Sequence, residues 1–103
     1  MAGRPRLLML SPKEQIILQL LVRDGELYGL QLVAGSRHRL KRGTAYVTLG
    51  RMEEKGYIAS RLEEPPAHEG GLPRRLYQPT ALGRRVLAAY TAPAAYLVPE
   101  FNQ

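Results

Sequence analysis

The side chains in this sequence that could do chemistry are mainly cationic, and they gather at three places. Residues 37–42 read Arg-His-Arg-Leu-Lys-Arg, Arg51 stands a short distance further on, and the pair Arg74 and Arg75 follows a glycine- and proline-rich stretch. Ammonium and guanidinium groups bind phosphates, and a guanidinium can also hydrogen bond guanine at two atoms. The pattern therefore indicates binding of an anionic polymer.

No comparable pattern of residues indicates catalysis or metal binding. The chain has no cysteine, which removes disulfides, thiolate zinc sites and cysteine nucleophiles together. His38 and His68 fall in expected polar loops without matching ligands at metal spacing, and the glutamate pairs at 53–54 and 63–64 are typical of solvated surfaces. We therefore predict no enzyme, no metal site and no cofactor.

The net charge supports the same interpretation and is distributed unevenly. The 103 residues carry a formal net charge of +6, and the pI is about 10.1. Residues 1–62 hold 11 Lys/Arg and 5 Asp/Glu, whereas residues 63–103 hold 4 of each. Cations set against phosphates release condensed counterions, so this excess favours nucleic acid. Charge alone leaves a generic basic protein as the alternative.

The elements that must position these cations begin with a strong helix start. Ser11 can cap free N–H groups, Pro12 suits the first helical position, and Glu14 can reach back to the cap. The apolar residues among 16–22 cover more than one helix face. This width predicts a helix that is buried both by its own core and by a partner subunit. Gly25 ends the helix.

A second helix is expected over residues 27–35 and a third over residues 42–55. Between them, Leu40 of the basic turn can enter the core. A spacing of about 100° per residue sorts the third helix into two sides. The core side holds Ala45, Leu49 and Met52, and the outer side holds Gly43, Val47, Gly50, Arg51 and Glu54.

Strands are expected over residues 57–62 and 75–78, joined by a long loop rich in Pro and Gly. Thr80 caps a last helix. This order of elements predicts an α+β, mainly α fold: a winged helix-turn-helix with three helices, a two-stranded β wing and a C-terminal helix. We divide the chain into a basic N-terminal arm at 1–10, a winged helix-turn-helix DNA-binding domain at 11–80, and a C-terminal dimerisation helix and tail at 81–103.

Four short stretches, in this order, resemble the PadR family of transcriptional regulators. They are Leu-Tyr-Gly at 27–29, Gly-Thr-Ala-Tyr at 43–46, Glu-Glu-Lys-Gly-Tyr-Ile at 53–58 and Leu-Pro-Arg-Arg-Leu-Tyr-Gln-Pro-Thr-Ala-Leu-Gly at 72–83. The resemblance implies the family's winged fold and a recognition helix that contains the second stretch. Lys41-Arg42 replaces the usual Ser-Pro, and Val47 replaces a usual Pro. Both departures alter the face that would meet DNA.

The short C-terminal part is similar to that of short-tailed PadR proteins, which implies a homodimer formed by the first and last helices. Such a dimer would place one recognition helix per subunit in successive major grooves of a pseudo-palindromic operator. We expect repression by promoter occlusion. The expected dimer interface residues are Ile17, Leu18, Leu21, Leu82, Val86 and Tyr90.

The predicted DNA surface centres on the third helix. Arg42 and Arg51 are the candidates for base or phosphate contacts, and Thr44 adds a hydroxyl for the backbone. Adjacent strand residues point to opposite faces, so one wing arginine reaches DNA, and we favour Arg74. The full set of expected DNA-binding residues is Arg37, Arg39, Lys41, Arg42, Thr44, Tyr46, Val47, Arg51, Arg74 and Arg75.

Two other functions stay open. The chain could be a winged-helix module that docks to a protein, or a ligand-sensing regulator with an aromatic effector at the dimer interface, although it has no Trp to stack one. The apolar runs are too short for a bilayer span or a signal-peptide core. We therefore expect a cytoplasmic, nucleoid-associated protein whose partners are double-stranded DNA and a second copy of itself, with no membrane partner.

Overall fold

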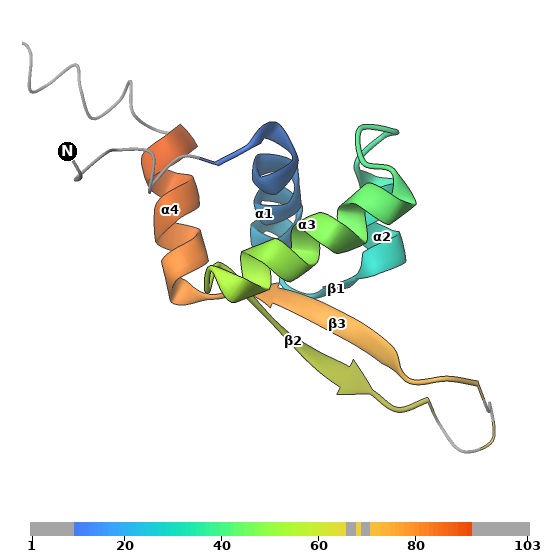
Figure 1. Cartoon of the computed structure of the whole chain (residues 1–103). Helices are drawn as coiled ribbons and strands as arrows, with labels where there is room; N and C mark the ends of the chain where they lie inside the picture. The colour runs from blue at the N-terminus through green and yellow to red at the C-terminus, as the bar shows by residue number, and fades with distance from the viewer. Residues whose placement is uncertain (1–9, 66–67, 69–70, 92–103) are drawn as a thin grey trace, which may run out of the picture.

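The computed structural model describes residues 10–65, 68 and 71–91, and these form four helices and a three-stranded sheet. Figure 1 shows α3 across the front of the domain, α4 at one side, and the hairpin of β2 and β3 reaching away from the helices. The predicted winged helix-turn-helix is confirmed, with one more strand than expected. In chain order the elements are α1 (Pro12–Asp24), β1 (Leu27–Tyr28), α2 (Gly29–Gly35), α3 (Arg42–Glu54), β2 (Ile58–Glu63), β3 (Arg74–Pro79) and α4 (Ala81–Thr91).

Helix α1 begins at the capping box that the sequence predicts. The Ser11 hydroxyl accepts a hydrogen bond from the Glu14 amide at 3.1 Å, and Glu14 Oε1 accepts one from the Ser11 amide at 2.9 Å. Pro12 follows the cap at the first helical position, where a missing N–H costs nothing. Capping of this kind contributes about 1 kcal/mol to a helix.

The apolar surface of α1 is wide because a single subunit surrounds it. Helix α1 contacts α2, α3, α4 and β3, and Ile17, Leu18 and Leu21 are 0 % exposed. These three residues, predicted to contact a partner subunit, are therefore core residues with no surface left to offer. Val86 on α4 is also buried. The structure thus corrects four of the six expected interface residues.

Helix α3 is held by the core side that its period predicts. Ala45, Leu49 and Met52 are fully buried, and Thr48 beside them is buried as well. Leu40 from the preceding turn also enters the core, as expected. Apolar burial along one side of α3 therefore fixes the helix and turns its other side outward.

The turn between α2 and α3 depends on Ser36, which is buried. The Ser36 hydroxyl donates to the Val33 carbonyl at 2.8 Å and accepts from the Leu40 amide at 3.0 Å. These bonds hold a turn in which Arg37 and His38 have φ angles of 55° and 72°. Such left-handed conformations cost about 1 kcal/mol or more for residues other than glycine. The turn is therefore a fixed connection that sets the direction of α3.

The sheet has the order β1-β3-β2 and is antiparallel throughout. Leu27 pairs with Tyr77 and Tyr28 pairs with Leu76. The expectation that residues 27 and 28 open the second helix is therefore wrong, since they form β1 and α2 begins at Gly29. A two-residue strand is defined by a partner far away in the sequence, so local periodicity does not reveal it.

The two ends of the β2–β3 hairpin meet at Thr80. The Thr80 hydroxyl donates to the Gly56 carbonyl at 2.6 Å and accepts from the Gly83 amide at 3.0 Å, which makes it the predicted cap of α4. The Thr80 amide also donates to the Tyr57 carbonyl at 3.0 Å. A Cβ at position 83 would overlap the Tyr57 carbonyl oxygen, so this close approach requires glycine.

Candidate nucleic-acid interface

The outward side of α3 carries small, apolar and cationic side chains. Tyr46 and Val47 are 44 % and 55 % exposed. The acidic residues of α3, Glu53 and Glu54, stand in its last turn. The N-terminal half of the helix can therefore approach base edges closely and brings no negative charge to the phosphates. The exposed residues of α3 that precede Glu53 are Arg42, Gly43, Tyr46, Val47, Gly50 and Arg51, with Thr44 half-buried.

The ring of Tyr46 lies over the start of α2. A Cβ placed on Gly29 would come within 2.6–2.7 Å of the outer ring atoms and hydroxyl of Tyr46. The glycine of the Tyr28-Gly29 pair thus leaves room for this ring. The residue is nevertheless 44 % exposed, so part of the Tyr46 side chain stays accessible to solvent.

Arg75 lies on the face of the sheet that meets α3. Opposed residues of antiparallel strands share a face, and Arg75 opposes Leu62 while Tyr77 opposes Ser60. Arg75 donates to the Ser60 hydroxyl at 3.0 Å, and that hydroxyl donates to Glu53 Oε2 on α3 at 2.7 Å. These contacts place the Arg75 guanidinium on the same side of the wing as α3.

Arg74 lies on the opposite face. Its guanidinium carbon is 4.3 Å from the centroid of the Tyr28 ring, and its Nη2 is 4.0 Å from Glu63 Oε1. The Tyr28 hydroxyl donates to the same glutamate oxygen, and this hydrogen bond raises the pKa of the Tyr28 phenol. That Arg74 is the wing residue that reaches DNA therefore stays a prediction, while Arg75 is the one that shares a face with α3.

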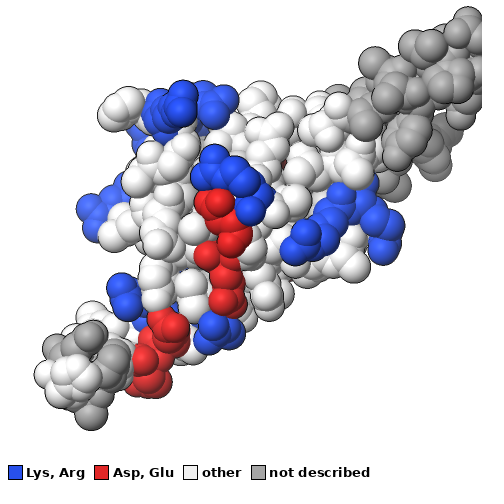
Figure 2. All heavy atoms as spheres, turned by 180° about the vertical axis from the view of Figure 1, so that it is seen from behind, with Lys and Arg blue, Asp and Glu red and all other residues white. Residues whose placement is uncertain are grey.

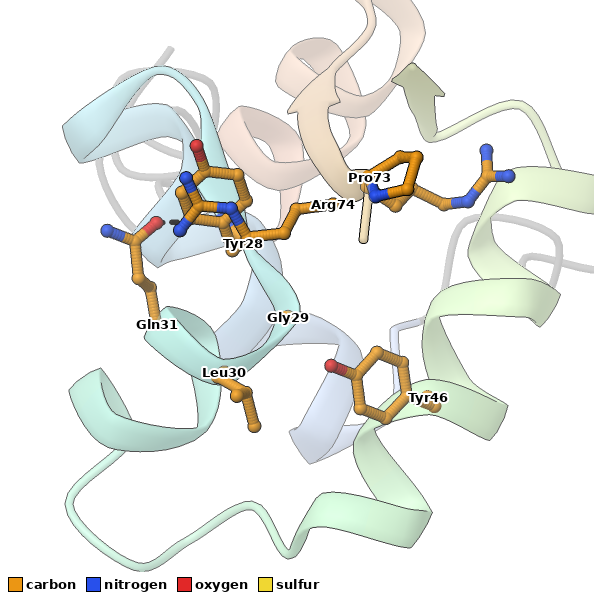
Figure 3. A pocket seen from close by; sticks show the side chains of 8 residues that line it. Tyr28, Gly29, Leu30, Gln31, Tyr46, Pro73 and Arg74 are labelled. Carbon is orange, nitrogen blue, oxygen red and sulfur yellow. Dashed lines mark hydrogen bonds between the residues drawn. The ribbon is translucent and has the colours of Figure 1, made fainter. Parts of the chain in front are cut away.

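A groove of about 460 Å³ runs between α2, α3 and the wing. In Figure 3, Arg74 lies across the Tyr28 ring above the groove, while Leu30 and Tyr46 line its lower part. Sequence reasoning missed Leu30 and Gln31, whose one available signal was their position directly after the Tyr-Gly pair. The lining residues are Tyr28, Gly29, Leu30, Gln31, Tyr46, Pro73, Arg74 and Arg75.

The cations of the α2–α3 turn divide into two groups. Lys41 and Arg42 are exposed where α3 begins. Arg37 and Arg39 instead line a second groove, of about 240 Å³, whose other side is formed by α1 and includes Arg23. Arg39 is fixed there, since its Nε donates to the Ser36 carbonyl at 3.1 Å. The predicted basic turn is therefore not one continuous surface.

Acidic side chains gather on the side of the domain away from α3. Figure 1 is seen with α3 in front, and Figure 2, seen from behind, shows acidic side chains in a line with basic side chains at both ends. Two exposed ion pairs, Arg23 with Asp24 and Arg61 with Glu26, each join at 2.9 Å. The acids on this side do not screen the N-terminal half of α3 from an approaching anion.

Lys55 is drawn away from the outward side of α3 by a buried carboxylate. Its Nζ lies 2.6 Å from Oε2 of Glu14, whose side chain is 6 % exposed. Burial opposes the charged form of Glu14, but the hydrogen bonds from Lys55 and Ser11 outweigh it and lower the pKa of Glu14. The pair ties the end of α3 to the start of α1, and only the opposite charges of the two residues could have indicated it before the structure.

Nothing in the described part of the chain suggests a metal site, since it contains no cluster of three or more His, Asp or Glu side chains suited to hold an ion. His38 and His68 are both exposed. Nor does any helix in residues 10–65, 68 and 71–91 have the length and apolar character needed to cross a membrane. Of the predicted basic arm at 1–10, only residue 10 is among the described residues. Of the predicted C-terminal helix and tail at 81–103, only residues 81–91 are.

The fold, with its exposed third helix beside a basic hairpin, defines the class of winged helix-turn-helix proteins. The model of the transcriptional regulator PadR-like family matches residues 17–89. This is most of the chain, which therefore belongs to the PadR-like family. The family is one of transcriptional regulators and is not a class of enzymes.

Solved structures agree with this assignment. A PadR family transcription regulator from Clostridium difficile R20291 is 27 % identical with a TM-score of 0.71, and the match covers 90 % of this chain and 97 % of that one. A PadR family regulator from Eggerthella lenta is 26 % identical with a TM-score of 0.64, covering 85 % and 79 %. Bacillus subtilis PadR, solved with operator DNA, shares the fold at 22 % identity and a TM-score of 0.70, with 81 % of this chain matched to 48 % of that chain. No curated protein matches this chain.

Proposed function

We propose that this PadR-like regulator binds operator DNA as a homodimer and represses transcription by occupying a promoter. The observation that supports this most strongly is the N-terminal half of α3, which is exposed, free of acidic residues and flanked by Lys41, Arg42 and Arg75. A helix of this kind fits the major groove. The shared fold with a PadR protein solved on operator DNA favours the same use of α3.

Within this proposal the exposed residues take different roles. Arg42 and Arg51 contact base edges, and each well-placed arginine–guanine pair contributes about 1–3 kcal/mol of discrimination. Val47 offers an apolar contact to a thymine methyl group. Lys41 contacts phosphates. Arg75 enters the minor groove from the wing.

The five remaining residues of the predicted set have lesser roles or none. The hydroxyls of Thr44 and Tyr46 serve the DNA backbone. Arg37 and Arg39 lie in the groove beside α1, so they contact phosphates at most at the edge of the interface. Arg74, held on Tyr28, is left out of the contact set.

The proposed dimer uses the part of α4 that one subunit leaves uncovered. Leu82 is 39 % exposed and Tyr90 is half-buried. For two α3 helices to enter successive major grooves, the twofold axis near α4 must place them about 34–36 Å apart, one helical turn of DNA. Sedimentation of Leu82→Glu should show more monomer than wild type, while Arg84→Glu, on the exposed side of the same helix, should not. Equal mass for all three proteins would contradict this interface.

Selection of bound sequences from random duplex DNA, at two ionic strengths, tests the DNA-binding function. We expect the wild-type chain to enrich a pseudo-palindrome. Arg51→Ala should relax the base preference at one position of the selected site. Lys41→Ala should weaken binding to all duplexes by the same factor and reduce the slope of log affinity against log salt concentration by about 1. Enrichment of no sequence by the wild-type chain would overturn the proposal, and identical behaviour of the two variants would overturn the division of roles.

A further inference from the structure

Three side chains on one face of the sheet form a cluster that is not part of the proposed set of DNA contacts. Tyr28 comes from β1, Glu63 from β2 and Arg74 from β3, so each strand contributes one member. Arg74 stacks on the Tyr28 ring, while Glu63 accepts from the Tyr28 hydroxyl and pairs with Arg74. We call these three residues the wing lock.

The wing lock lies where backbone pairing on one side of β3 has ended. Strand β1 pairs only through Leu27 and Tyr28, and its last partner on β3 is Leu76. The β2–β3 ladder continues outward to the pair of Glu63 with Arg74. Residues 74 and 75 therefore have no β1 partner in the ladder, and the Tyr28 ring contacts Arg74 from the body of the domain.

A second contact on the same face of the sheet joins the wing to the body of the domain. Arg61 donates to both carboxylate oxygens of Glu26, at 2.9 Å and 3.1 Å. Arg61 opposes Leu76, so it shares the face of Tyr28 and Arg74. The wing is thus tied to the segment before α2 at two levels, near its base and near its outer end.

Fixing Arg74 also fixes its neighbour. Adjacent strand residues point to opposite faces, so a strand held with Arg74 on Tyr28 must present Arg75 to the side of α3. The hydrogen bond from Arg75 to Ser60 is consistent with this orientation. If Arg74 left Tyr28, the outer part of β3 could twist and Arg75 would lose its fixed direction.

We propose that Tyr28 and Arg74 are positioning residues: their stacked pair locks the wing so that Arg75 meets DNA, and Arg74 itself makes no DNA contact. This inference rests on the proposed function. It assigns a positioning role to Arg74 and a DNA-contacting role to Arg75. It also gives the Tyr28 of the Tyr-Gly pair a task besides packing.

Titration of duplex DNA with the full chain, over a series of salt concentrations, tests this division. Arg75→Ala should lower the log–log salt slope by about 1, as expected for a lost phosphate contact. Arg74→Ala and Tyr28→Leu should each weaken binding by about two- to fivefold, the size of an exposed cation–π contact, with the slope unchanged. Tyr28→Phe, which keeps the ring, should stay near wild type.

The double variant separates positioning from direct contact. If Arg74 acts through Tyr28, the double variant of Tyr28→Leu with Arg74→Ala binds no more weakly than the weaker single variant. If Arg74 touches DNA, the two losses multiply and Arg74→Ala lowers the salt slope by about 1. The second pattern would overturn the inference.

Hydrogen exchange without DNA makes the two proposals distinguishable. Amides of residues 74–76 should exchange faster in Arg74→Ala and Tyr28→Leu than in wild type, and not in Arg75→Ala, while the amides of α1 and α3 show that each variant is folded. Unchanged exchange in the first two variants would refute the wing lock whatever the DNA result. If the wild-type chain binds no duplex selectively while the exchange pattern is as expected, the proposed function and the DNA role of the wing lock are refuted. The contact between Arg74 and Tyr28 would still stand.

Discussion

Helix α3 and the wing reach the same proposed surface but are held by different forces. The inner side of α3 is fully buried in apolar contacts. The outer wing depends on charged and aromatic side chains in partial contact with solvent, such as Arg74 and Glu63, whose side chains are 58 % and 39 % exposed. Apolar burial is little affected by salt, whereas exposed charge pairs are screened. The comparison implies a rigid α3 beside an adjustable wing.

The largest effect should follow from removing apolar burial under α3. Leu49→Ala should lower the free energy of unfolding by about 3 kcal/mol, because it leaves a cavity in a fully buried position. Urea unfolding followed by circular dichroism measures this change. Val47→Ala, on the exposed side of the same helix, should change it by less than about 0.5 kcal/mol. Similar losses for both variants would contradict burial as the force that holds α3.

The junction between the wing and α4 should be the next most sensitive point. Gly83→Ala places a methyl group against the Tyr57 carbonyl, and such overpacking costs about 2 kcal/mol. Gly50→Ala is the matched control, since a Cβ there meets nothing within 4 Å. It should stabilise the protein by about 0.5–1 kcal/mol through the better helix propensity of alanine. Thermal unfolding of both variants checks the sign of each change.

The Glu14–Lys55 pair should give stability that depends on pH. The folded pKa of Glu14 is lowered, so its contribution is present above the unfolded value of about 4.3 and is lost as pH falls through the folded pKa. Glu14→Gln keeps a capping side chain and should cost about 1 kcal/mol at pH 7. The difference from wild type should shrink below pH ~4.

Glu54→Gln controls for the loss of one negative charge, since Glu54 is exposed and joins no ion pair in the described residues. Unfolding curves of the three proteins between neutral and acidic pH provide the measurement. A Glu14→Gln difference that persists unchanged in acid would show that the charge of Glu14 plays no part.

The smallest effect concerns salt and tests the comparison directly. Raising the salt concentration should speed hydrogen exchange in the outer part of β3 by about twofold, because the wing contacts are exposed charges. Exchange in α3 around Leu49 should not change. Equal salt dependence in the two regions would remove the proposed difference between them.

Local periodicity and capping made α3 and the start of α1 predictable. The apolar spacing of Ala45, Leu49 and Met52 and the Ser11–Glu14 box both act within a single helix, and the structure confirms them. Strand β1 was missed because Leu27 and Tyr28 become a strand only through pairing with β3. Elements that depend on a remote partner leave no periodic signal.

The candidate site shows the same limit. Alternation correctly placed Arg74 and Arg75 on opposite faces but could not say which face meets α3. The width of the apolar surface on α1 was assigned in part to a second subunit, although α2, α3, α4 and β3 of one chain already cover Ile17, Leu18 and Leu21. Sequence shows how much surface must be buried and leaves open what buries it.

The closure of the hairpin at Thr80 has a consequence for how this protein can vary. Because Thr80 bonds to Gly56 and Tyr57, the chain enters and leaves the wing at one point. Strand pairing ends at Glu63 and Arg74, so the length of the segment that joins these two residues affects folding mainly through loop entropy, at about 0.6 kcal/mol per doubling. Insertions or deletions near the tip should therefore be tolerated, so the reach of the wing along a duplex can change while the helical body stays the same.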